Sequence, residues 1–143
     1  MINPISLVPT LLALQFAIFG WRIAREVPLG DKHKRTWLLM SDYYNLFSML
    51  MVILFCVIIP LKSNDFPKLS SSVLGSAYTL MAFVPFMIAG HYRLFSRSGR
   101  AIYAKRKGGV PWITGQEAVI AILAFLSATA VALFIANPTL FGA

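Results

Sequence analysis

The chain has 143 residues and little of what a soluble enzyme needs. It holds only five acidic residues and two histidines, and Cys56 is the only cysteine. A single cysteine excludes a disulfide framework, a zinc site built on thiolates and a disulfide exchanger. HExxH, GxSxG and P-loop patterns are absent, as is any aspartate-rich run that would hold magnesium on a lipid phosphate. We therefore predict no catalytic residues, no metal and no cofactor, and we expect that the chain is not an enzyme.

Charge is missing from the middle of four long apolar runs. Hydrophobic residues make up 58% of the chain, whereas a soluble globular domain is about 45–50% apolar. A helix that spans a membrane needs roughly 20 mostly apolar residues. The sequence predicts an all-α polytopic membrane protein, one domain over residues 1–143 with four transmembrane helices at about 5–24, 37–61, 69–92 and 114–136.

Basic residues are absent from residues 1–21 and 108–143, and they gather in two loops. Residues 22–35 hold five Lys and Arg, residues 93–107 hold six, and the middle loop holds only two. Lys and Arg beside membrane spans mark the cytoplasmic side. The loops at about 25–36 and 93–113 are therefore expected in the cytoplasm. Both termini are expected outside, in a multi-pass protein of the cell inner (plasma) membrane.

The two basic loops have two interpretations. The cations either set the topology and contact the anionic headgroups of membrane lipids, or they form a receptor for an anionic cytoplasmic ligand such as a nucleotide or oligonucleotide. In the second interpretation the ligand-binding face consists of Arg22, Arg25, Lys32, Lys34, Arg35, Arg97, Arg100, Lys105, Arg106 and Lys107.

A further polar cluster is predicted where the spans reach the cytoplasm. Asp42 lies about one turn inside the apolar boundary, where a carboxylate is costly and is usually paired or functional. We expect Arg22, His91 or Arg93 as its partner. The cluster either locks the bundle as a set of ion pairs, or it couples binding at the loops to helix movement or lines the inner mouth of a pore. Its members are Asp42, Asn45, His91, Arg93, Gln116 and Glu117.

Polar residues within the spans predict a second face. Gln15 is the one strongly polar side chain near the middle of the first span, and it should face another helix because lipid offers it no partner. Hydroxyl-bearing residues follow one another at helical spacing in the third span. A pore-lining or helix-contact face is predicted from Gln15, Ser48, Ser72, Ser76 and Thr79.

Small residues, prolines and glycines predict further details of the helices. Stripes of small residues in the first and fourth spans predict the closest helix approaches there. Pro28 and Gly30 predict a turn after the first span, and Pro85 predicts a kink in the third. Thr114 and Glu117 have the spacing of a capping box at the start of the fourth. The two stripes are Ala13, Ala17, Gly20 and Ala24, and Ala121, Ala124, Ala128 and Ala132.

The middle of the bilayer is almost free of ionisable groups, which argues against a proton-coupled transporter but not against a channel. Over its whole length the layout resembles the small four-span membrane effectors of bacterial anti-phage systems. That resemblance is one of architecture, and it carries over no residue roles. It implies a homo-oligomeric ion channel, or membrane-permeabilising effector, gated by a nucleotide or oligonucleotide that a partner enzyme makes.

Two other functions remain open. The chain would serve as a non-catalytic membrane anchor or assembly subunit if its polar helix ends bind another membrane subunit. It would be a small membrane enzyme acting on lipid or quinone if an acid–base pair such as Asp42 and His91 had a reactive partner.

Overall fold

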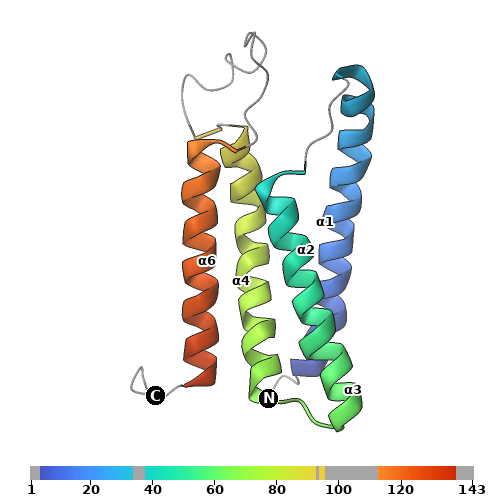
Figure 1. Ribbon diagram of the computed structural model, residues 1–143, viewed down its shortest axis with the longest axis vertical. Helices are drawn as coiled ribbons and strands as arrows, with labels where there is room; N and C mark the ends of the chain where they lie inside the picture. Colours follow the sequence, from blue (N-terminus) through green and yellow to red (C-terminus); the bar gives the residue numbers. More distant parts are fainter. Residues whose placement is uncertain (1–3, 34–37, 93, 96–112, 138–143) are drawn as a thin grey trace.

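The computed structural model describes residues 4–33, 38–92, 94–95 and 113–137, and over 29–33 the backbone alone. Every element in these ranges is helical. The elements are α1 (Pro4–His33), α2 (Met40–Val52), the π-helix η1 (Ile53–Ile58), α3 (Ile59–Ser63), α4 (Lys68–His91) and α6 (Gly115–Ala136). Because α2, η1 and α3 follow one another directly, they form one rod, and the described chain consists of four rods (Figure 1).

Four stretches are long and apolar enough to cross a membrane: Pro4–Pro28, Met40–Ser63, Lys68–His91 and Gly115–Ala136. This confirms the predicted all-α fold with four spans. The start of α1, the end of α6 and the connection from α3 to α4 lie at one end of the bundle (Figure 1). We call the opposite end, where α1 and α4 finish and α2 and α6 begin, the basic end, because both basic loops join helices there.

The helices stand in a row in the order α1, α2, α4, α6 (Figure 1). The most extensive contact is between α4 and α6. It depends on small residues, since Ala121, Ala124 and Ala128 of α6 are buried. On α4, a Cβ atom at Gly90 would lie 2.9 Å from Ile120 Cδ1 and 3.1 Å from the backbone nitrogen of Glu117. The predicted stripe of the fourth span therefore serves close helix packing.

The small-residue stripe of the first span was predicted wrongly to make close contacts. Ala13, Ala17, Gly20 and Ala24 are exposed in the single chain, and a Cβ atom at Gly20 would meet nothing within 4 Å. A helix at the edge of the row buries only one face. In α1 that face carries the polar side chains, because lipid cannot satisfy their hydrogen bonds.

The turn predicted at Pro28 needs correction, whereas the kink at Pro85 stays a prediction. Pro28 and Gly30 do not form a turn, because α1 continues as a helix to His33. Pro28 removes one backbone hydrogen bond and crowds the carbonyl four residues earlier, while the Arg22–Glu26 ion pair bridges the preceding turn. Pro85 lies inside α4, and the helix runs through it without interruption from Lys68 to His91.

The π-helix η1 precedes Pro60. The N–H group of Ile59 donates to Leu54 O, five residues back. In the same register Phe55 O would need an N–H group from Pro60, which has none. The Ser70 hydroxyl of α4 donates to Phe55 O instead, and the Cys56 thiol donates to Ser70 O at 3.3 Å. Cys56 is thus a buried contact residue that ties η1 to α4.

Gly90→Ala and Gly20→Ala form a matched test of the α4–α6 packing. We expect Gly90→Ala to destabilise the protein by about 1–3 kcal/mol, because backbone atoms of α6 block the new methyl group. Gly20→Ala should be neutral or stabilise by up to roughly 1 kcal/mol, since Ala is the better helix former. Thermal unfolding of the purified variants in detergent measures both. Equal melting temperatures would contradict the described packing.

Candidate functional site

Arg22 and Asp42 form a buried ion pair between α1 and α2. Arg22 Nε lies 3.1 Å from Asp42 Oδ1, and Arg22 Nη2 lies 3.2 Å from Asp42 Oδ2. Arg22 Nη1 donates to Glu26 Oε1 at 2.9 Å, one turn along α1. The side chains of Arg22 and Asp42 are only 1% and 3% exposed. Asp42 therefore has one of its expected partners, and each charge is compensated where water is scarce.

Glu117 joins three helices at the same end. Its Oε1 atom accepts from the Met40 N–H group of α2 at 3.0 Å, and its Oε2 atom lies 2.7 Å from His91 Nδ1 of α4. Thr114 and Glu117 form the predicted capping box, with Glu117 N donating to Thr114 Oγ1 at 3.1 Å. The Thr114 hydroxyl also donates to Gly90 O at 2.7 Å. The start of α6 is thus tied to the end of α4.

The start of α2 connects the two groups. Asp42 Oδ2 accepts from the Leu39 N–H group at 2.8 Å, and Glu117 accepts from the next N–H group, that of Met40. The first N–H groups of a helix have no partner within the helix and carry partial positive charge. Two carboxylates from different helices satisfy these groups here.

The polar cluster predicted from the sequence divides into two contact groups. Arg22, Asp42 and Glu26 lie between α1 and α2, whereas His91 and Glu117 lie between α4 and α6. The two groups meet at the adjacent N–H groups of Leu39 and Met40. The remaining members lie elsewhere: Asn45 faces α1, Gln116 is half-buried beside Glu117, and Arg93 is outside the described residues.

Polar contacts continue from the ion pair toward the middle of the membrane. Asn45 Nδ2 donates to Gln15 O at 3.0 Å, and Gln15 Nε2 donates to Ser48 Oγ at 2.9 Å. Gln15 therefore faces another helix, as expected. Together with the ion pair these residues form a continuous polar line between α1 and α2. We call this line the polar seam, and its members are Gln15, Arg22, Ser41, Asp42, Asn45 and Ser48.

The hydroxyl-bearing residues of α4 do not join this seam. Ser72, Ser76 and Thr79 each donate to the carbonyl oxygen four residues earlier. Ser76 also donates to Ala128 O of α6 at 2.9 Å. Of the predicted pore or helix-contact face, these residues support the helix-contact interpretation. Gln15 and Ser48 lie at a separate interface.

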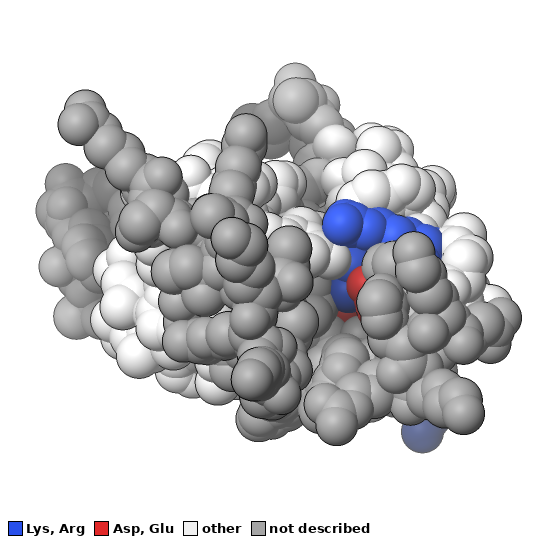
Figure 2. All heavy atoms as spheres, turned by 90° about the horizontal axis from the view of Figure 1, so that it is seen from above, with Lys and Arg blue, Asp and Glu red and all other residues white. Residues whose placement is uncertain are grey.

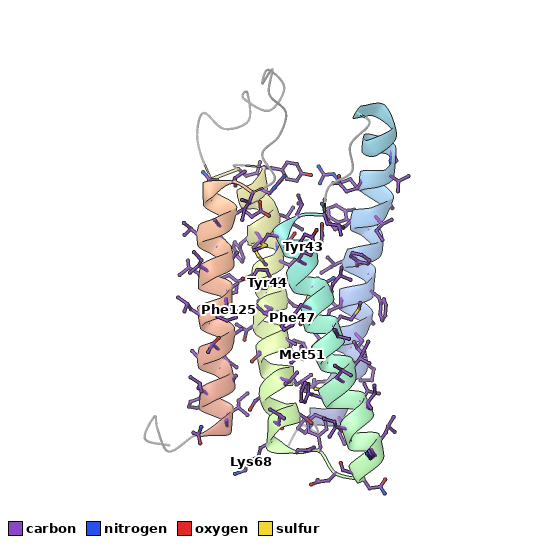
Figure 3. The ribbon with its side chains drawn as sticks, viewed as in Figure 1. Tyr43, Tyr44, Phe47, Met51, Lys68 and Phe125 are labelled. Carbon is purple, nitrogen blue, oxygen red and sulfur yellow. The ribbon has the colours of Figure 1, made fainter. Side chains whose placement is uncertain are left out.

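An apolar groove of about 470 Å³ opens on the side of the bundle over α4. Figure 3 labels Tyr43, Tyr44 and Phe47 along α2 and Phe125 on α6, the two walls of the groove. Its few polar groups bond within the protein, since Tyr44 Oη donates to Ala121 O and Thr129 Oγ1 to Phe125 O. The lining is Met40, Tyr43, Tyr44, Phe47, Ser76, Leu80, Phe125, Ala128, Thr129 and Ala132.

The predicted ligand-binding face is only partly described. Arg22 was predicted wrongly as a member of this face, because its guanidinium is buried in the ion pair and does not present a surface to a ligand. Arg25 packs over Tyr92, with its Cζ atom 4.7 Å from the ring centroid. Lys32 lies on α1 without a described side chain. The other members, Lys34, Arg35, Arg97, Arg100, Lys105, Arg106 and Lys107, lie outside the described residues.

Charge at the basic end is strongly unbalanced. Eleven Lys and Arg and four acidic residues belong to this end by sequence, which is a formal charge of +7 of the total +8. Three of those acidic residues, Glu26, Asp42 and Glu117, are already engaged with Arg22, His91 or backbone N–H groups. Figure 2, a view onto this end, shows described basic and acidic side chains next to one another. The acidic residues thus serve contacts within the bundle.

Comparison with protein-family models, with curated proteins and with solved structures finds no match to this chain. Among the described residues, no three or more His, Cys, Asp and Glu side chains gather as a metal ion would require.

Glu26 and Ser41 are site residues that the sequence analysis missed. The spacing of Arg22 and Glu26, four residues apart on one helix, is the signal that predicts their ion pair. Ser41 gave no such signal, because a serine beside an aspartate is common at the start of any helix.

Loss of one partner of the Arg22–Asp42 pair should destabilise the bundle strongly. We expect Arg22→Met to cost about 3–5 kcal/mol, because the carboxylate of Asp42 stays buried without its cation. Arg25→Met is the control, and loss of its contact with Tyr92 should cost about 0.5–1 kcal/mol. Thermal unfolding in detergent compares the two. An Arg22 variant as stable as the Arg25 variant would show that the pair does not hold α1.

Proposed function

We propose that this protein is a homo-oligomeric membrane channel, or membrane-permeabilising effector, of the inner membrane, opened by an anionic ligand on its basic end. One observation carries the proposal: a formal charge of +7 adjoins a buried ion pair that holds α1 against α2. A nucleotide or oligonucleotide supplies the phosphates that such a surface attracts, in a salt-dependent manner.

The Arg22–Asp42 pair is the contact through which such a ligand would act. Negative charge bound on the neighbouring cations of the basic end weakens the attraction between Asp42 and Arg22, because the buried guanidinium then interacts with a second anion. Of the four rods, α1 is the one at the edge of the row beside α2 (Figure 1). Its movement leaves the extensive contact between α4 and α6 in place. In this proposal a shift of α1 transmits ligand binding to the membrane-spanning part.

In this proposal the pore forms between copies of the protein, or along a helix–helix interface that opens when the ligand binds. In the described chain the interior is filled, because Leu11, Val52, Met87 and Ala124 are fully buried. The exposed small residues of α1, among them Gly20, permit close approach of a second copy. A closed ring of copies would place several basic ends around one axis.

The proposed orientation puts the basic end in the cytoplasm and both termini outside. A reporter enzyme fused after Ala143 tests this, with fusions after Asn64 as a second point on the same side of the bundle. Activity of a periplasmic reporter at both positions is the expected result. A cytoplasmic signal at both positions would overturn the orientation and would place the cations outside the cell.

Ion flux from liposomes that contain the purified protein tests the function. We expect polyphosphate or a short oligonucleotide on the basic side to start flux, and higher salt to raise the concentration required. Changing Lys105, Arg106 and Lys107 together to Gln should weaken the response roughly a hundredfold, from about 1 kcal/mol for each cation.

The matched control changes Lys62 and Lys68 to Gln at the opposite end, which should leave the response unchanged. An equal loss in both variants would mean that total charge, and not the basic end, governs the response. A well-folded oligomer without flux under any of these anions would refute the channel.

The apolar groove favours a second candidate function, a non-catalytic anchor or assembly subunit. The groove runs along α2, α4 and α6, has aromatic walls, and has small residues such as Ala128 and Ala132 on its α6 side. These are features of a surface that receives a helix from another membrane subunit. An anchor would be harmless when overproduced and unstable alone, whereas a channel would purify as a closed oligomer and collapse the membrane potential once activated.

A further inference from the structure

Three polar atoms in the polar seam have no hydrogen-bond partner among the described residues: Gln15 Oε1, Ser41 Oγ and Asn45 Oδ1. Each of these side chains is at most 2% exposed. In folded proteins such buried atoms almost always bond to protein or to ordered water, and lipid hydrocarbon can supply neither. All three lie on the α1–α2 interface, in the half of the membrane that faces the basic end.

The presence of unsatisfied polar atoms in the seam does not depend on how the amide groups are oriented. Asn45 Nδ2 donates to Gln15 O at 3.0 Å, so exchanging its oxygen and nitrogen would set two oxygen atoms against each other. In Gln15 the exchange would let Oε1 accept from Ser48 and would leave the nitrogen without a partner. In either orientation the seam contains unsatisfied polar atoms.

The geometry of α2 arranges these groups in a line. Ser41, Asn45 and Ser48 are four and three residues apart, and therefore share one face of the helix. Asp42, beside Ser41, bonds to Leu39 N at the very start of α2. The line thus runs from the basic end to Gln15 at mid-span. Beyond Gln15 the α1–α2 contact is apolar, with Leu11 and Val52 fully buried and Val8 nearly so.

We propose that the polar seam is a water-accessible vestibule that opens at the basic end and is closed at mid-membrane by Leu11 and Val52. Its ligand is water, which donates to the amide oxygens of Gln15 and Asn45 and exchanges hydrogen bonds with the Ser41 hydroxyl. A buried water requires two to four such polar partners. This inference rests on the proposed channel function. It locates the hydrated half of the ion path, which an apolar constriction closes at mid-membrane.

Cysteine accessibility tests the vestibule in a Cys56→Ser background. Ser41→Cys and Ser48→Cys keep the size of the side chain and place a thiol in the seam. Phe47→Cys is the control for Ser48, because Phe47 is adjacent on α2 but 59% exposed on the outer, lipid-facing surface. Val52→Cys reports on the closed half. The probe is an anionic, membrane-impermeant methanethiosulfonate, added to proteoliposomes from the basic side.

We expect the Ser41 and Ser48 variants to react at least tenfold faster than the Phe47 and Val52 variants, because only a thiol in contact with water ionises and reacts. Magnetisation exchange between water and the side-chain amides of Gln15 and Asn45, measured on the unsubstituted protein, is the second readout and needs no variant. Exchange at these amides is expected even if the reagent proves too wide to enter.

Slow reaction at all four positions together with no exchange at the two amides would overturn the vestibule. Both readouts are independent of ion flux. A hydrated seam without flux would therefore refute the channel alone, whereas flux through a protein with a dry seam would refute the vestibule alone.

Discussion

Two carboxylates at the start of α2 hold this bundle together. Asp42 and Glu117 accept from the first N–H groups of α2, and each then binds a side chain of another helix, Arg22 of α1 or His91 of α4. Glu117 also closes the capping box that begins α6. All four rods therefore meet through two acidic side chains. The physical reason is the bilayer, in which water cannot bond the first N–H groups of a helix or solvate a charged side chain.

The same constraint divides the helices into two kinds of interface. The α4–α6 interface is close, because Gly90 and the alanines of α6 let the backbones approach, and along the helices it is largely apolar, with polar contacts at His91, Thr114 and Ser76. The α1–α2 interface is polar, and its contacts are hydrogen bonds and ion pairs. Polar contacts exchange partners with anions and water, whereas apolar packing does not. For this reason both proposals, the anion response and the vestibule, fall on the α1–α2 side.

Much of the architecture could be predicted from the sequence, because hydrophobic length and helix caps are local. The four spans follow from apolar runs of about 20 residues, and the Thr114–Glu117 cap follows from its spacing. The inward direction of Gln15 follows from the absence of any partner in lipid. Local sequence patterns did not predict those features of the backbone that involve a residue far away in the chain. The π-helix at Ile53–Ile58 depends on Ser70, which supplies the donor that Pro60 lacks.

By itself, the sequence determined the number of helices, their polar ends and the charge difference between the two ends of the bundle. Only the tertiary structure decided which helices are neighbours. In the order α1, α2, α4, α6, Asp42 pairs with Arg22 and Glu117 pairs with His91. The small residues of α1 then lie on its exposed face. The physical reason is that each helix has one pattern of polar and small residues but several faces. Which face is buried depends on what the neighbouring helix offers it.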